Sequence, residues 1–219
     1  MLRALPNLLT LYRLAAAPGL ALAYLAFDRP VADALALALF TSASITDWLD
    51  GKLARAWQAE SDFGRMMDPI ADKAMVVIAL VIVVMHTGPS FISLIPAVAI
   101  LFREVAVSGL REFLAGREDV PVSRLAKWKT GVQMVALCLL FGWSWADARV
   151  QALMFTLGPP DYMRIRGGEA PDELGLVFAD IASQILPWAG FALLWAAAAL
   201  TLVTGYQYFR MALAPRREA

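Results

Sequence analysis

The chain has 219 residues and a formal net charge of zero. Hydrophobic residues make up 60% of it, charged residues only 17%, and its mean hydropathy is +0.61. These values exclude an ordinary soluble domain. The chain has no β-rich run, internal repeat or low-complexity tract, so neither a nucleic-acid-binding module nor a soluble second domain is indicated.

Apolar stretches of membrane-spanning length recur along the chain. About 20 helical residues cross about 30 Å of hydrocarbon. The pattern predicts an all-α, polytopic membrane protein with six transmembrane helices in one bundle, forming a single domain over 1–219. A short amphipathic segment on the membrane surface is expected before the first helix. The six predicted spans are 6–27, 31–55, 64–87, 90–115, 124–146 and 183–210.

Polar residues in the first predicted span recur at three-residue steps, as Asn7, Thr10 and Arg13. Such a row lies on one side of a helix near the membrane surface. Interfacial anchoring is one interpretation. The other is that these side chains border a binding cleft.

An unusual group of residues lies between positions 47 and 72 of this apolar chain. Acidic side chains at a membrane boundary are costly and need a reason. Five of these residues share one stripe of the second helix, and three share a stripe of the third. The eight residues are Asp47, Asp50, Gly51, Ala54, Arg55, Gly64, Asp68 and Asp72.

The short polar segment between the two stripes lets the two helices run antiparallel, so we expect four carboxylates and Arg55 to face one another. Carboxylates this close need positive charge among them. Hard oxygen ligands suit Mg²⁺ or Mn²⁺, and four could hold two ions about 3.5–4 Å apart, as in displacement at phosphorus. The alternative is a set of solvated helix ends or ion pairs with Arg55, Arg65 and Lys73. The predicted metal ligands are Asp47, Asp50, Asp68 and Asp72.

The small residues of the first stripe favour a phosphate ligand. Gly51 and Ala54 lack bulk, so a phosphate can approach the helix backbone closely. Arg55 offers it a charged, two-pronged donor.

The spacing D-x2-D-G-x2-A-R-x8-G-x3-D-x3-D from Asp47 to Asp72 resembles the signature of the CDP-alcohol phosphotransferases. Other segments resemble the phosphatidylglycerophosphate synthase branch of that family. The resemblance covers about residues 4–141, with Ala126 where glycine is expected. The further segments are 5–13, 103–104, 110–112, 122–130 and 133–134.

The resemblance implies an enzyme that transfers the phosphatidyl group of CDP-diacylglycerol to the 1-hydroxyl of sn-glycerol 3-phosphate and releases CMP. It also implies a cofactor of two Mg²⁺ or Mn²⁺ ions, a homodimer, and Asp72 as the general base. The residues expected to bind the CDP-lipid are Asp47, Gly51, Ala54, Arg55 and Gly64.

The acceptor, glycerol 3-phosphate, carries a dianion and needs a cationic pocket of its own. Arg103 and Arg111 lie about 80° apart around the fourth helix, near enough to border one cavity. Lys127 and Thr130 share a face at the start of the fifth helix, with Lys129 on a neighbouring one. Attraction to anionic lipid head groups is the alternative role for these cations.

Positive side chains are unequally distributed between the two ends of the predicted bundle. Fifteen of the 19 Lys and Arg residues fall on the side of the aspartates. The positive-inside rule therefore predicts that both termini and the active site lie in the cytoplasm. The resemblance implies that the membrane is the bacterial inner membrane. The polar segment 147–182 is expected as a loop on the outer side.

Two other functions remain open. One keeps the fold but changes the acceptor, as in a cardiolipin synthase or a phosphatidylinositol-phosphate synthase. The order Lys127-x-Lys129-Thr130 argues against the cardiolipin synthase. The other is a divalent-cation transporter, which would place acids deep within several helices, whereas here they gather at one end.

Overall fold

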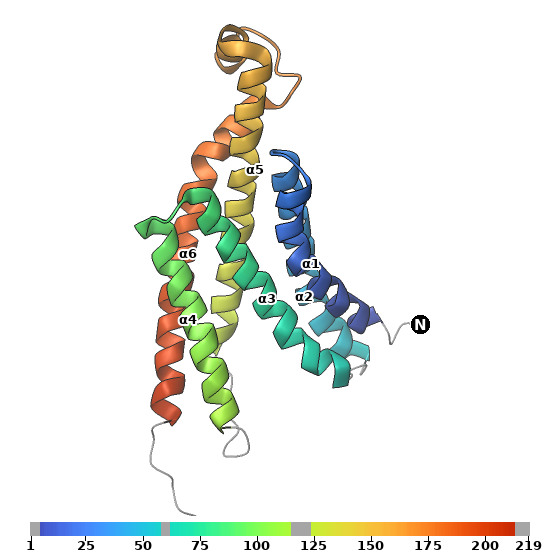
Figure 1. Ribbon diagram of the computed structural model, residues 1–219, viewed down its shortest axis with the longest axis vertical. Coiled ribbons are helices and arrows are strands. Elements are labelled where there is room, and N and C mark those ends of the chain that lie inside the picture. Colours follow the sequence, from blue (N-terminus) through green and yellow to red (C-terminus); the bar gives the residue numbers. More distant parts are fainter. Residues whose placement is uncertain (1–4, 58–61, 115–123, 213–219) are drawn as a thin grey trace, which may run out of the picture.

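The computed structural model describes residues 5–57, 62–114 and 124–212, and all of their regular structure is helical (Figure 1). The predicted all-α fold is therefore confirmed, and the first four predicted spans agree with the helices to within a few residues. The helices are α1 (Leu5–Ala26), α2 (Val31–Trp57), α3 (Asp62–Thr87), α4 (Phe91–Leu114), α5 (Arg124–Arg166) and α6 (Leu176–Ala212).

Five of the described helices are long and apolar enough to cross a membrane: α1, α3, α4, α5 and α6. The sixth, α2, has 27 residues and is about 40 Å long. Its hydropathy is lowered by Asp33 near its start and by the charged residues from Asp47 onward. The chain is thus a multi-pass membrane protein with five to six spanning helices.

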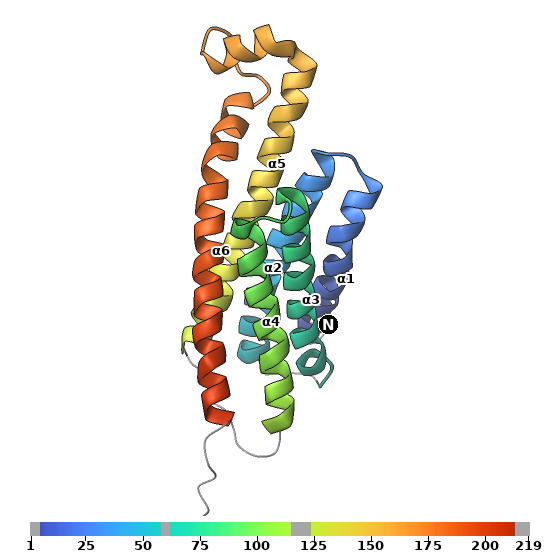
Figure 2. The same cartoon turned by 60° about the vertical axis from the view of Figure 1, so that its left-hand side comes forward.

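The six helices form two groups that meet along α5. In one group, α1 packs against both α2 and α3; in the other, α6 packs along α5 and α4 (Figures 1 and 2). α2 and α3 have little direct contact with each other, because α1 lies against both. α1 therefore joins the two helices whose aspartates were expected to face one another.

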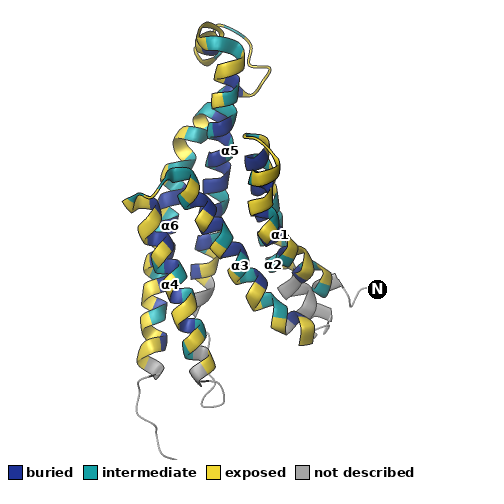
Figure 3. Ribbon diagram, in the orientation of Figure 1, coloured by how far each residue is buried: buried dark blue, intermediate teal, exposed yellow. Residues whose placement is uncertain are grey.

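Small side chains line the core of the bundle. Buried alanines such as Ala17, Ala36 and Ala79 let helix backbones approach closely. Between them, the rings of Phe40 and Phe141 pack at a tilt of 40° with centroids 5.3 Å apart. Figure 3 shows that the outward sides of the helices are largely exposed, as expected for surfaces that face lipid.

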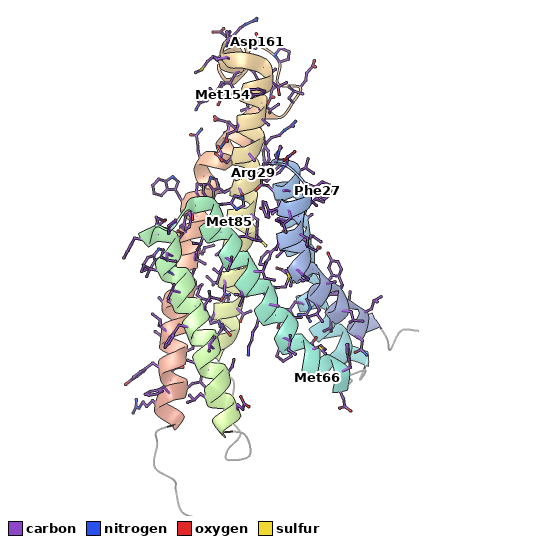
Figure 4. The ribbon with its side chains drawn as sticks, viewed as in Figure 1. Phe27, Arg29, Met66, Met85, Met154 and Asp161 are labelled. Carbon is purple, nitrogen blue, oxygen red and sulfur yellow. The ribbon has the colours of Figure 1, made fainter. Side chains whose placement is uncertain are left out.

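The segment 147–182, expected as an outer loop, is mostly helical. α5 continues to Arg166 with a kink at Gly158, whose φ of 77° is left-handed and suits glycine. Proline fits the first turn of the helix that resumes after it. Leu153, Tyr162 and Leu176 bury one another in a small second core, which lets this hairpin fold beyond the bundle. Asp161 lies at its far tip in Figure 4.

The start of α6 is fixed by the carboxylate of Asp172. Its two oxygens accept hydrogen bonds from the backbone N–H groups of Leu176 (2.8 Å) and Val177 (2.9 Å). These bonds lower the pKa of Asp172, and the bond from Val177 has the largest effect. Capping of this kind satisfies donors that the first helical turn leaves unpaired. At least one polar residue of the segment 147–182 therefore caps a helix and does not belong to a solvated loop.

A buried polar cluster joins the end of α1 and the start of α2 to the middle of α5. Asp33 is fully buried and accepts hydrogen bonds from Arg29 Nε (2.7 Å), Tyr24 Oη (3.1 Å) and Ser144 Oγ (2.6 Å). Nε2 of His86 lies 3.6 Å from Asp33 Oδ1. Figure 4 shows Arg29 at this end, far from Met66 near the start of α3. The cluster holds these helices together at the end of the bundle opposite the aspartates of α3.

Candidate active site

The guanidinium of Arg13 in α1 is the centre at which the aspartates converge. Its Nη1 atom contacts Oδ1 of Asp47 in α2 and Oδ1 of Asp72 in α3. Its Nη2 atom donates to Oδ1 of Asp68, one helical turn before Asp72, at 3.0 Å. Three predicted metal ligands from two helices therefore meet on a cation that belongs to a third helix.

Thr10 contributes to the same cluster. It lies one turn before Arg13 on α1, and its Oγ1 donates to Oδ1 of Asp68 at 2.7 Å. Both Thr10 and Arg13 are buried, each with 2% of its surface exposed. The structure thus favours the second interpretation of the polar row in α1, in which these residues border a site.

The cluster has a buried side and an open side. The Arg13 side chain is 2% exposed, whereas those of Asp47, Asp68 and Asp72 are 32%, 44% and 41% exposed. Among these described side chains, one positive charge faces three negative charges, a net of minus two. A divalent cation approaching from the open side would neutralise that excess.

The donor set fits a hard divalent cation, although Arg13 occupies the point of convergence. Among the described residues, no group of three or more His, Cys, Asp or Glu side chains is already arranged around a metal position. Asp47 and Asp72 nevertheless contact the same nitrogen, so their bound oxygens lie within two hydrogen-bond lengths, about 6 Å. Carboxylate oxygens are the hard ligands that Mg²⁺ and Mn²⁺ prefer.

Several predicted site residues lie outside what the structure describes. The backbone of α2 is helical through Trp57, so the predicted stripe is on a helix. The side chains of Asp50, Ala54, Arg55, Arg111 and Lys127 are not among those described. Their roles stay predictions.

A cavity of about 350 Å³ adjoins the aspartates. Asp68 and Asp72 of α3 form one of its walls, and residues of α4 and α5 form the others. This volume falls within the range for small-molecule sites. The residues that line it are Asp68, Pro69, Asp72, Lys73, Val76, Arg103, Glu104, Lys129, Thr130, Gln133 and Met134.

The wall opposite the aspartates is cationic. Lys129 Nζ contacts Oε1 of Glu104, and Arg103 Nη1 donates to the same oxygen at 3.2 Å. Lys73 Nζ donates to Ser108 Oγ at 2.5 Å. Arg103 and Lys129 together with Glu104 leave this wall an excess of one positive charge, and Lys73, on α3 beside Asp72, adds another cation at the cavity.

Arg103 is held in place from α6 as well. Its Nη2 donates to Oγ1 of Thr204 at 3.2 Å, and its guanidinium carbon lies 5.9 Å from the ring centroid of Tyr208. A side chain of this length loses much rotamer freedom when it is fixed. Because neighbouring side chains already impose that order, Arg103 is preorganised to bind an anion.

Some of the residues predicted from the sequence line this cavity. Arg103, Lys129 and Thr130, predicted to bind the acceptor, all line the cavity. The convergence of the aspartates on Arg13 and the pairing of Glu104 with Lys129 were missed. For the convergence on Arg13, the one signal in the sequence was the three-residue step from Thr10 to Arg13.

Comparison with known proteins agrees with this geometry. A family model described as CDP-alcohol phosphatidyltransferase matches residues 3–158. A relative from Cereibacter sphaeroides is 49% identical over 211 residues, which are 95% of each chain. One from Rickettsia bellii is 38% identical over 94% of this chain and 93% of its own. One from Haemophilus influenzae is 41% identical over 61% of this chain and 72% of its own. All three are named CDP-diacylglycerol–glycerol-3-phosphate 3-phosphatidyltransferase.

Proposed function

Since this chain belongs to the CDP-alcohol phosphatidyltransferase family, we propose that it transfers the phosphatidyl group of CDP-diacylglycerol to sn-glycerol 3-phosphate. The products are phosphatidylglycerophosphate and CMP. The family resemblance of the Asp47–Asp72 signature is thereby confirmed. One observation carries the proposal: a single cavity joins a wall of aspartates to a wall of cations.

The cationic wall binds the phosphate of the acceptor. Lys129 and Arg103 supply charge-assisted hydrogen bonds, and Thr130 adds a hydroxyl at the same cavity. Glu104 fixes the direction of both cations without cancelling their combined charge. Arg111 and Lys127 belong to the same proposed pocket by their positions in the sequence.

The aspartates bind divalent metal. Asp47, Asp50, Asp68 and Asp72 are the proposed ligands of two Mg²⁺ or Mn²⁺ ions. Such ions, when bound, supply charge neutralisation at the diphosphate and at the departing CMP. Gly51, Ala54, Arg55 and Gly64 complete the proposed CDP-lipid site together with Asp47.

Asp72 is the proposed general base by family resemblance, and its place in the acidic cluster and on the wall of the acceptor cavity supports that role. In the reaction, the 1-hydroxyl oxygen of glycerol 3-phosphate forms a bond to the phosphatidyl phosphorus. The bond from that phosphorus to the CMP oxygen breaks, and Asp72 accepts the hydroxyl proton. Lys129 and Arg103 hold the acceptor so that its hydroxyl reaches the phosphorus.

The same proposal places the protein in the bacterial inner membrane, with both termini and the active site in the cytoplasm. The unequal distribution of positive side chains supports this orientation. A homodimer is proposed from the family resemblance. In this orientation the hairpin at the far end of α5 and α6 lies on the outer side.

The test is an acceptor panel with purified protein in detergent, CDP-diacylglycerol and Mg²⁺ or Mn²⁺. CMP release is measured with glycerol 3-phosphate, phosphatidylglycerol or inositol phosphate as acceptor. We expect CMP to be released only when glycerol 3-phosphate is the acceptor. This release should stop when EDTA is added. Preferential release with phosphatidylglycerol or inositol phosphate would instead assign one of the other acceptors.

A further inference from the structure

We propose that Arg13 is a built-in cation of the metal site: it holds the aspartates together from their buried side and stays in place when divalent ions bind from the open side. The inference rests on the proposed function in one respect, namely that Asp47, Asp68 and Asp72 are metal ligands. Arg13 is a positioning residue, because it acts through these aspartates.

The burial of Arg13 explains why its guanidinium is paired with carboxylates. Arg13 is one of the largest fully buried side chains among the described residues. A buried guanidinium is costly unless carboxylates compensate its charge. Its carboxylates come from α2 and α3, which have little contact with each other. Arg13 therefore bonds to both halves of the acidic cluster.

Arg13 uses one oxygen of each carboxylate. Its described bonds to Asp47, Asp68 and Asp72 all end on Oδ1. Thr10 also donates to Oδ1 of Asp68. A carboxylate has two oxygens and about four acceptor positions. Each aspartate can therefore bind Arg13 through Oδ1 and a metal ion through Oδ2 at the same time.

Charge explains why the cation is needed before metal binds. With Arg13 the described cluster has a net charge of minus two, and without it minus three. Three carboxylates without a counter-charge repel one another at this spacing. Arg13 thus keeps the ligands converged in the metal-free protein and leaves a negative charge that divalent ions can balance.

The test is thermal unfolding of the purified protein in detergent, in EDTA and in saturating Mn²⁺. Binding to the folded state raises the unfolding midpoint. We expect Arg13→Met to unfold at a much lower temperature than the wild type in EDTA. Mn²⁺ should recover much of that loss, so the Mn²⁺-induced rise becomes about twice that of the wild type or more.

Arg29→Met is the matched control. Arg29 also pairs with a buried aspartate, Asp33, but at the opposite end of the bundle. Its substitution should lower the midpoint equally in EDTA and in Mn²⁺. Arg13→Lys provides a second variant should the methionine variant not fold. It keeps the charge but not the two-pronged geometry, so its Mn²⁺-induced rise should lie between those of wild type and Arg13→Met.

The outcomes separate this inference from the proposed function. A wild-type midpoint that Mn²⁺ does not raise would overturn the metal site itself. A wild-type rise that is unchanged in Arg13→Met and Arg13→Lys would show that Arg13 is an ordinary structural ion pair. A Mn²⁺ titration monitored by electron paramagnetic resonance tests whether the aspartates bind Arg13 and metal at the same time. Tighter binding by Arg13→Lys than by wild type would mean that Arg13 must leave before metal binds.

Discussion

Gly205 of α6 lies directly against the side chain of Arg103 in α4, since a Cβ atom added at Gly205 would stand 3.0 Å from Cγ of Arg103. The same arginine is bonded to Thr204 and Glu104. The absence of a side chain at Gly205 therefore lets Arg103 reach the cavity. α6, which does not line the cavity among its described residues, nevertheless shapes it through this contact.

Gly205→Ala should displace Arg103 by a few tenths of an ångström and weaken acceptor binding. We expect the KM for glycerol 3-phosphate to rise about threefold to tenfold, with the KM for CDP-diacylglycerol unchanged. Steady-state CMP release at varied acceptor concentration measures this. Gly109→Ala in α4 is the control, because a Cβ there meets open space. Equal effects of the two substitutions would remove Gly205 from the acceptor pocket.

Lys129→Gln should remove one of the cations that bind the acceptor phosphate. A charge-assisted hydrogen bond contributes about 1.5–3 kcal/mol, so the KM for glycerol 3-phosphate should rise about tenfold to a hundredfold. Arg164→Gln is the control, since Arg164 is exposed on the hairpin at the other end of the molecule. An equal rise in the KM for CDP-diacylglycerol would place Lys129 outside the acceptor pocket.

The helices of this fold were predictable because local composition determines them. The predicted span 31–55 matches α2, Val31–Trp57, since its apolar run begins after Pro30 and its polar end continues the helical stripe. The segment 147–182 was predicted wrongly as a loop. Its polar residues satisfy helix ends and ion pairs such as Arg166 with Asp180, at 3.0 Å, which composition does not reveal.

The candidate site was predictable only in part. The offsets between Asp68 and Asp72 follow from helical geometry and needed no structure. Arg13 lies 34 residues from Asp47 and 59 from Asp72 in the chain. No local periodicity relates residues so distant, so their meeting depends on how α1 packs between its neighbours. Glu104 was missed for another reason, because the requirement for cations around a phosphate does not call for an acid among them.

Asp72→Asn should abolish turnover while metal and CDP-lipid binding largely persist. The amide cannot accept the hydroxyl proton, but its oxygen can still be a ligand. Single-turnover CMP release measures catalysis, and Mn²⁺ titration measures binding. Asp47→Asn is the comparison, because Asp47 does not line the acceptor cavity and should lose metal affinity first. Lost binding with residual catalysis in Asp72→Asn would reverse the two roles.

Asp33→Asn should destabilise the protein without changing its chemistry. Asp33 is fully buried and pairs with Arg29, so neutralising it leaves that arginine without its counter-charge. The Arg29 side chain is 41% exposed, so water compensates part of its charge and the cost is smaller than for a fully buried ion pair. We expect the unfolding midpoint to fall in both EDTA and Mn²⁺. The kcat of the folded protein should stay unchanged, because the cluster lies at the end of the bundle opposite the acidic site. Asp161→Asn, at the exposed tip of the hairpin, should change neither quantity. If the kcat of Asp33→Asn is lower than that of the wild type at temperatures where the variant is folded, the two ends of the bundle are coupled.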